Sequence, residues 1–281
     1  MSFLGLILCG LIFFSGNLLC QFVSGQKANI HLDYYQSLNV AFTGVILGYG
    51  FNLIREIDMI TEIAFYSGLI ISGITILSML SGLLNFLRSR DLSRIIASFY
   101  ILSGLFNIDK TEFSFNNITQ LLSRFTWELP QTLVGYIFAQ SMNSIGRVAE
   151  VRFIAGATYC IHFQHSNRRQ GVSISNFIYV SLLPREYMFE KDPLLLHEYG
   201  HHLQSRKYGL LYLFIIGFPS LISVLRAKPL PGGVTTHDLQ WYEMQANRYA
   251  GAYLQKNYQA DWSQFEPPFN SFPRTKFRDL T

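Results

Sequence analysis

The residues best suited to chemistry are His197, Glu198 and His201, which form an H-E-x-x-H sequence within residues 194–202. Two histidines four positions apart leave the same face of a helix, one turn from each other, and can occupy two corners of a zinc tetrahedron. Glu198 lies beside them, where a carboxylate can polarise a metal-bound water. The motif predicts a zinc centre. The alternative is a polar helix surface that happens to carry three histidines.

The residues around the motif predict the helix that it needs. Asp192 suits an N-cap, and Pro193 suits the first helical position, where its missing N–H costs nothing. The helix is predicted to run through Lys207 and to end at Gly209 in a left-handed turn. Gly200 is the one breaker inside it, and we expect this glycine to let another element approach the helix closely.

Two histidines leave a catalytic zinc site incomplete, because such a site takes three protein ligands and one water. The downstream candidates are Glu243, His237 and Asp238. Glu243 is favoured because, on a helix, it shares a face with Asn247, whose amide can accept the N–H of a zinc-bound histidine. The sequence therefore predicts a final helix from about Thr236 or Asp238 to residue 256.

The H-E-x-x-H at 197–201 and the E-x-x-A-N at 243–247 together resemble the glutamate-zincin metallopeptidases. The similarity is greatest to the membrane-bound families that include the CAAX-prenyl protease and the heat-shock membrane protease, in which a later helix carries E-x-x-A-D. The resemblance covers roughly the last half of the chain. It implies that His197, His201 and Glu243 bind Zn²⁺ and that Glu198 is the general base. Asn247 stands where the family has an aspartate beside the ligands.

This resemblance implies a membrane-associated zinc metallopeptidase. Glu198 would take a proton from the metal-bound water, which then attacks the carbonyl of a peptide or protein substrate. His237, Tyr242 and Tyr208 remain open as stabilisers of the transition state, each with a structural role as the alternative. Because Asn247 brings no charge, a catalytically weak or inactive zincin scaffold, acting as a membrane binding or structural protein, is the second reading.

The composition lies between that of a soluble enzyme and that of a membrane protein. Of the 281 residues, 14% are charged and 49% hydrophobic, against about a quarter charged in typical domains. The net charge of +4 comes without a large basic cluster, which argues against a nucleic-acid partner. The three cysteines offer neither a disulfide framework nor a cysteine zinc site. Nothing in the sequence indicates the oligomeric state.

Several long uncharged runs predict membrane association. Residues 63–87 form a run of 25, long enough to cross a bilayer and therefore to involve membrane lipid as a partner. Residues 37–54 stay open between a span and a buried helix. Residues 208–225 contain Gly217 and Pro219, which favour a buried or membrane-dipping segment over a span.

The ends of the chain and its orientation are less constrained. Residues 1–26 carry no charge and are either a signal peptide, which would imply export, or an uncleaved anchor. Signal peptides usually carry a basic segment before the apolar one, and its absence here favours the anchor. Arg88, Arg90 and Arg94 follow the run 63–87 and Arg55 precedes it, which places the downstream domain on the cytoplasmic side.

The predicted organisation is an anchor or signal peptide at 1–26, an apolar helical region at 27–110, a zincin-like domain at 111–256 and a tail at 257–281. Within the third region, helices are expected near 117–125 and 130–143, with Glu128 between them as a surface or capping carboxylate. Period-two alternation over 149–180 predicts three antiparallel strands with one apolar face. The fold class is therefore α+β, with a small antiparallel sheet and active-site helices after an apolar helical region.

Overall fold

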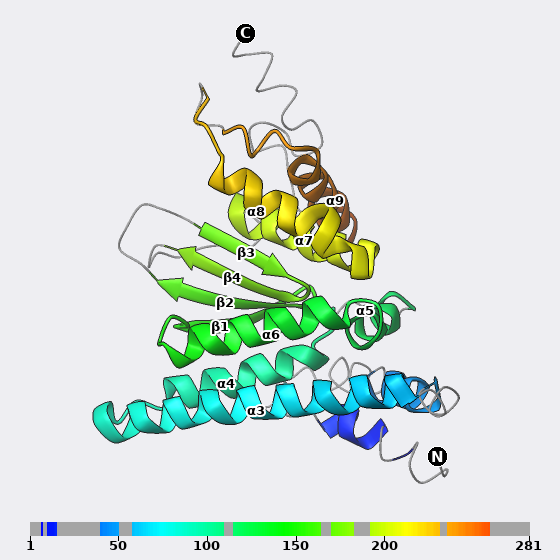
Figure 1. Cartoon of the computed structure of the whole chain (residues 1–281), viewed down its shortest axis with the longest axis vertical. Coiled ribbons are helices and arrows are strands. Elements are labelled where there is room, and N and C mark those ends of the chain that lie inside the picture. The colour runs from blue at the N-terminus through cyan, green and yellow to red at the C-terminus, as the bar shows by residue number, and fades with distance from the viewer. Residues whose placement is uncertain are drawn as a thin grey trace.

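The computed structural model describes residues 7, 10–15, 40–50, 58–109, 115–163, 170–182, 192–230 and 235–258. Over this part of the chain, helices and one small sheet form an α+β fold, which confirms the predicted class at that level. Figure 1 shows α3 on one side, then α4 and α6, then the sheet, with α7 and α9 on the far side of the sheet. The helices are α3 (Asp58–Ser89), α4 (Ser93–Ser103), α5 (Phe115–Phe125), α6 (Leu129–Ser144), α7 (Pro193–Tyr208), α8 (Phe218–Leu225) and α9 (Trp241–Tyr258), and the strands are β1 (Glu150–Ile154), β2 (Ala157–Phe163), β3 (Gln170–Ile174) and β4 (Phe177–Leu182).

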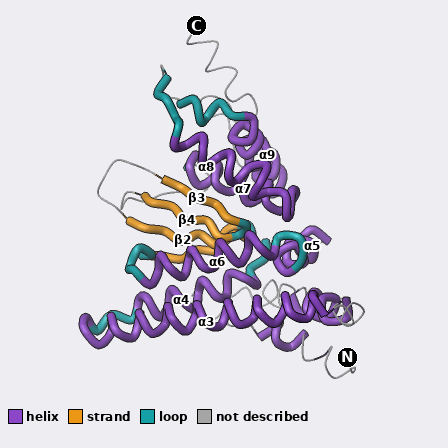
Figure 2. The backbone as a smooth tube through the Cα atoms, in the orientation of Figure 1, coloured by secondary structure: helices purple, strands orange, loops and turns teal. Residues whose placement is uncertain are grey.

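The sheet has four strands and is mixed, so the predicted antiparallel three-stranded sheet is wrong. Its strand order is β1-β2-β4-β3, with antiparallel pairs at the two edges and the parallel pair β2–β4 in the centre. Figure 2 shows β4 between β2 and β3. Tight turns close the antiparallel pairs: φ is 51° at Ala155 and 80° at Gly156 in the first, and 56° at Ser175 in the second. Alternation located the strands, but β3 pairs with the far side of β4 and not with β2.

Both faces of the sheet are covered, which corrects the expectation of one apolar face. Tyr159 and Ile161 of β2 pack toward α7, whereas Cys160 packs toward α4 and α6. All three are fully buried. The small, uncharged side chain of Cys160 thus takes part in a second core on the opposite face.

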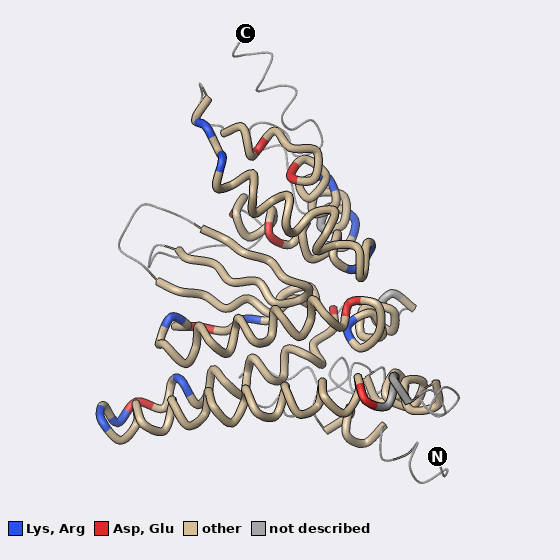
Figure 3. Tube along the Cα trace, in the orientation of Figure 1, with Lys and Arg blue, Asp and Glu red and all other residues tan. Residues whose placement is uncertain are grey.

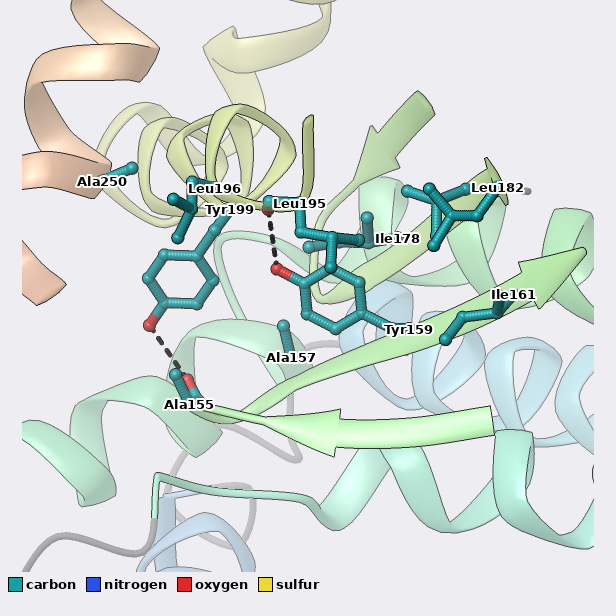
Figure 4. Close-up of a cluster of buried hydrophobic side chains, with 11 residues drawn as sticks. Ala155, Ala157, Tyr159, Ile161, Ile178, Leu182, Leu195, Leu196, Tyr199 and Ala250 are labelled. Carbon is teal, nitrogen blue, oxygen red and sulfur yellow. Dashed lines mark hydrogen bonds between the residues drawn. The ribbon is translucent and has the colours of Figure 1, made fainter. Parts of the chain in front are cut away.

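The core between the sheet and α7 fixes the motif helix in place (Figure 4). Two tyrosine hydroxyls cross it as hydrogen-bond donors. Tyr159 donates to the carbonyl of Leu195 at 3.0 Å, and Tyr199 donates to the carbonyl of Ala155 at 2.9 Å. Buried polar groups with satisfied partners define a single arrangement more sharply than apolar packing alone.

Helix α3 exposes large apolar side chains and buries hydroxyl groups, which is the opposite of the pattern in a helix on the surface of a water-soluble protein. Thr75 and Ser78 are 7% and 1% exposed and meet α6, whereas Leu77 and Leu84 are 62% and 58% exposed. The stretch Glu62–Ser89 of α3 is long and apolar enough to cross a membrane. Figure 3 shows its charged residues gathered near the two ends. These features agree with the prediction for residues 63–87.

The other apolar runs differ from α3. The described part of 37–54 is the helix Val40–Gly50, which is too short to cross a bilayer by itself. Run 208–225 is broken: the helical segment that ends at Leu211 and the segment Leu213–Leu225 meet at 117°. No residue of α8 is buried, so the buried alternative is wrong for α8.

The predicted boundary near residue 110 divides a shared core. Ala97, Ile101 and Leu105, from before the boundary, pack with Tyr136 of α6 and Phe177 of β4. The helices predicted near 117–125 and 130–143 are present as α5 and α6. Most of the predicted N-terminal segment 1–26 and the tail from residue 259 lie outside the described residues.

Candidate metal centre

Helix α7 carries the H-E-x-x-H residues and has the predicted ends. The Asp192 side chain accepts hydrogen bonds from the N–H groups of Leu194 and Leu195 at 3.0 and 3.3 Å. Gly209 follows the last turn with a φ of 53°. The rings of His197 and His201 lie edge to face, with centroids 4.8 Å apart. Both imidazoles therefore leave one face of α7, as their spacing predicts.

Helix α9 approaches that face because Gly200 has no side chain. A Cβ at Gly200 would lie 2.0 Å from the carbonyl oxygen of Ala246 and 2.4 Å from its carbonyl carbon. The two helix backbones are thus in direct contact at this residue, as expected from the sequence. The same approach brings Glu243, one turn before Ala246, to the two histidines.

The three predicted ligands converge on one point. Oε2 of Glu243 lies 3.1 Å from Nε2 of His197 and 2.9 Å from Nε2 of His201. One ligand atom from each of the three residues lies within 4.8 Å of the others. Zinc bonds of about 2.0–2.1 Å at tetrahedral angles separate neighbouring ligand atoms by roughly 3.3 Å. The two separations from Glu243 are near this value, so the two imidazoles and the carboxylate could hold a metal ion, and a set of three such ligands is the kind that leaves the fourth position of a zinc ion to water.

Each ligand also contacts an uncharged partner that orients it. Nδ1 of His197 lies 2.8 Å from Oδ1 of Asn247, as predicted, and Nδ1 of His201 lies 2.8 Å from Oε1 of Gln204. The Ser220 hydroxyl donates to Oε1 of Glu243 at 2.6 Å, which leaves Oε2 toward the histidines. An amide oxygen accepts the Nδ1–H and so directs the lone pair of Nε2 toward the metal position.

Sequence reasoning missed Gln204 and Ser220. Gln204 follows His201 by three residues, which is a helical neighbour spacing and could have identified it. Its own orientation depends on α9, because its amide also donates to the carbonyl of Tyr242 at 2.7 Å. Ser220 lies within an apolar run whose path no local pattern predicts.

The charges in this site depend strongly on one another. Burial opposes ionisation of Glu243, but the adjacent His201 and His197 outweigh it and hold the pKa of this carboxyl far below its usual value. Burial likewise disfavours the charged form of His197, yet its hydrogen bond to Glu243 and the nearby Glu198 raise the pKa of His197 to about 9. In the metal-free protein, this raised pKa favours the protonated form of His197 at neutral pH.

This protonation makes metal binding depend on pH. Zinc takes a neutral imidazole, so it must displace the His197 proton at any pH below the His197 pKa of about 9. We expect the apparent zinc affinity to rise about tenfold per pH unit as pH increases toward that value, and to level off above it. Competition against a chelator of known affinity at a series of pH values measures the slope. An affinity that is constant over this range would contradict the assignment of His197 as a ligand.

Glu198 lies against the edge strand β3. Glu198 is 5% exposed, and burial raises the pKa of its carboxyl group. A Cβ placed on Gly171 of β3 would lie 2.3 Å from Oε1 and 2.6 Å from Cδ of Glu198. Only a glycine at 171 leaves space for the carboxylate in this position.

Gly171→Ala should therefore displace Glu198 while leaving the fold and the metal ligands in place. The obstructed atoms are the end of a flexible side chain, so we expect a displaced Glu198 carboxylate, and a hydrolytic activity that used this carboxylate as its base would fall on the order of a hundredfold. Zinc content should stay near that of the wild type. Gly68→Ala is the matched control, because nothing lies within 4 Å of a Cβ there. Equal hydrolysis rates for the two variants would refute the assigned position of the base.

The other residues that the sequence offered as a third ligand or as stabilisers of the transition state lie at different places around the centre. Nε2 of His237 lies 3.6 Å from Oε1 of Glu243, so His237 borders the site. The Tyr242 hydroxyl donates to the carbonyl of Pro219 at 3.0 Å, and that of Tyr208 donates to Gln245 at 3.1 Å. Asp238 accepts from the N–H of Thr235 at 2.7 Å, in a turn before α9. That turn explains why α9 begins at Trp241, later than predicted.

The centre thus combines two imidazoles and a carboxylate that could hold a metal ion, a buried carboxylate beside them, and an uncharged partner for each of the three. Its residues come from α7, α8, α9 and the edge of the sheet. Comparison of the chain with protein-family models, with curated proteins and with solved structures found no match.

Proposed function

We propose that this chain is a membrane-associated zinc metallopeptidase of the glutamate-zincin type. The observation that carries the proposal is the convergence of His197, His201 and Glu243, whose ligand atoms lie within 4.8 Å of one another beside Glu198. A bound Zn²⁺ would supply a Lewis acid that acidifies a water and polarises a carbonyl oxygen.

The protein residues supply the remaining chemistry. Glu198 accepts the proton of the attacking water and passes it to the leaving amine, and its raised pKa, caused by burial, makes it suited to both transfers. Asn247 and Gln204 hold the imidazoles with Nε2 directed inward. His237 is near enough to Glu243 to contact a substrate oxygen at the same centre.

Strand β3 supports an extended substrate. Among the described residues it is an edge strand that pairs only with β4, and its Gly171 lies against Glu198. A polypeptide in extended conformation can add to such an edge through main-chain hydrogen bonds, which would bring a peptide carbonyl to the base.

Membrane association rests on α3, which exposes many of its large apolar residues and buries Ser67, Thr75 and Ser78. In lipid, apolar side chains face outward and hydroxyl groups join neighbouring helices. The distribution of arginines around this helix, with Arg55 before it and Arg88, Arg90 and Arg94 after its apolar run, favours a cytoplasmic position for its downstream end.

The specific test is Glu198→Gln in the full-length protein. The variant should keep about one zinc per chain, because Glu198 is not a ligand, and should lose on the order of 10²–10⁴-fold in peptide hydrolysis. Metal analysis and a peptide-library cleavage assay measure the two quantities. A wild-type protein that holds no zinc, and that chelators do not affect, would end the proposal.

A second function is favoured by one observation. Both histidine partners, Asn247 and Gln204, are uncharged, so neither raises ligand basicity as an aspartate would. This is consistent with a zincin scaffold that binds metal but serves as a membrane binding or structural protein. Zinc binding without cleavage of any library peptide would support it.

A further inference from the structure

Helix α8 has two faces of opposite chemistry. Its outer face carries Phe218, Leu221, Ile222 and Leu225, which are between 47% and 78% exposed. These positions recur at the three- and four-residue spacing of one helix face. An exposed apolar face of this kind marks a site of contact with another phase or another molecule.

The inner face of α8 contacts the metal centre. The Ser220 hydroxyl donates to Oε1 of Glu243 at 2.6 Å, and Oγ of Ser223 lies 2.6 Å from Nδ1 of His237. The carbonyl of Pro219 at the start of α8 accepts the hydroxyl proton of Tyr242. Three side chains around the centre are therefore held by one short helix.

The charge pattern around α8 fits a lipid bilayer. The 18 residues from 208 to 225 carry no charge, and exposed Arg226 and Lys228 follow them directly. Cationic side chains at the end of an apolar surface suit anionic headgroups next to acyl chains. Figure 3 shows these cations in the segment that leaves α8.

The position of α8 relative to α3 also favours membrane lipid as the partner of α8. In Figure 1, α3 runs across the width of the molecule, and α8 lies above the middle of α3, not beyond either end. When α3 crosses a bilayer, its axis runs roughly along the bilayer normal, and α8 lies within the length of α3 along that direction. The same bilayer therefore includes the depth at which α8 lies, although α8 is on the opposite side of the sheet from α3.

We propose that α8 contacts membrane lipid through its apolar face and thereby holds Glu243 and His237 through Ser220 and Ser223. Lipid contact keeps α8 in place, and the two hydroxyls transmit its position to the third metal ligand. The link to the metal rests on the proposed function, whereas the lipid contact does not. Membrane insertion would thus favour the geometry that binds zinc.

The lipid contact is tested in full-length protein reconstituted into vesicles of phosphatidylcholine and phosphatidylglycerol. Nitroxide labels are placed by Leu221→Cys, by Leu225→Cys and, as a control, by Lys228→Cys. Cys9 and Cys20 are replaced by serine, and Cys160 is retained because it is fully buried. Labels at 221 and 225 should be relaxed by oxygen more than by a water-soluble nickel complex, with the order reversed at 228. Relaxation by the nickel complex at 221 and 225, or protection from both agents through contact with a second copy, would overturn the proposal.

The coupling is tested by zinc affinity in the same vesicles, without any cleavage assay. Ser220→Ala should lower the affinity on the order of 10–100-fold, and Leu221→Lys, which drives α8 out of lipid, by about as much. If Ser220 transmits the effect, Leu221→Lys should cost little more in the Ser220→Ala background. If the loss of zinc affinity in the double variant equalled the product of the losses in the two single variants, the two residues would act independently and the coupling would be overturned. A wild type that binds no zinc would overturn both the coupling and the proposed function, while the nitroxide result would still decide the lipid contact.

Discussion

Replacing Glu243 by alanine is expected to leave the protein folded and nearly free of zinc. Glu243 is 1% exposed and supplies the only carboxylate oxygen within 3.1 Å of both imidazole Nε2 atoms among the described residues. Its loss removes one of three ligands and the negative charge that stabilises them. A fall in zinc affinity on the order of a thousandfold or more follows, because two histidines alone make an incomplete site.

The matched variant is His237→Ala, which removes a side chain that also borders Glu243. His237 contacts Oε1, the oxygen on the side away from the histidine pair, at 3.6 Å. Zinc content should therefore stay near one per chain, with any loss appearing in hydrolysis. Metal analysis of the two purified variants beside the wild type separates the roles. A loss of zinc in the His237 variant alone would reverse the ligand assignment.

The motif helix was predictable because all its determinants are local. Asp192, Pro193 and Gly209 define its ends through contacts within a few residues. The spacing of His197 and His201 then places both imidazoles on one face, whatever the rest of the fold does. The role of Glu243 was predicted from its own helical neighbour Asn247, and both now lie at the histidines.

The sheet order was not predictable because it depends on distant contacts. The hairpin turns at Ala155-Gly156 and at Ser175 depend on local contacts. The parallel pairing of β2 with β4 in the centre of the sheet depends instead on contacts of Asn176 with distant parts of the chain. The carbonyl of Asn176 accepts the N–H of Thr158 at 2.7 Å, and its amide donates to the carbonyl of Gly104 at 2.8 Å. Strand alternation contains no information about such partners.

Glu128 shows the same limit for a charged residue. Its position before Leu129-Pro130 indicated a surface or capping carboxylate, yet it is fully buried and caps nothing with its side chain. Burial raises the pKa of Glu128, while Arg124 and Arg206 lie near enough to oppose that rise. These arginines come from α5 and α7, so their electrostatic effect on Glu128 arises only when the two helices meet.

Substituting alanine for Gly200 is expected to separate α7 from α9. The added Cβ would lie 2.0 Å from the carbonyl oxygen of Ala246 and within 2.8 Å of its Cα, and helix backbone cannot yield as a side chain can. Overpacking of this kind costs about 3 kcal/mol or more. Any relief by movement of α9 carries Glu243 away from the histidines, so zinc affinity should fall together with the melting temperature.

Gly73→Ala in α3 is the control, since nothing lies within 4 Å of a Cβ at that position. There the change should be neutral or stabilising by up to about 1 kcal/mol, because alanine is the better helix former. Thermal unfolding and zinc titration of both variants give the comparison. If Gly200→Ala matched the wild type in both measurements, the helices would not be in backbone contact, and the close crossing that brings Glu243 to His197 and His201 would need another explanation.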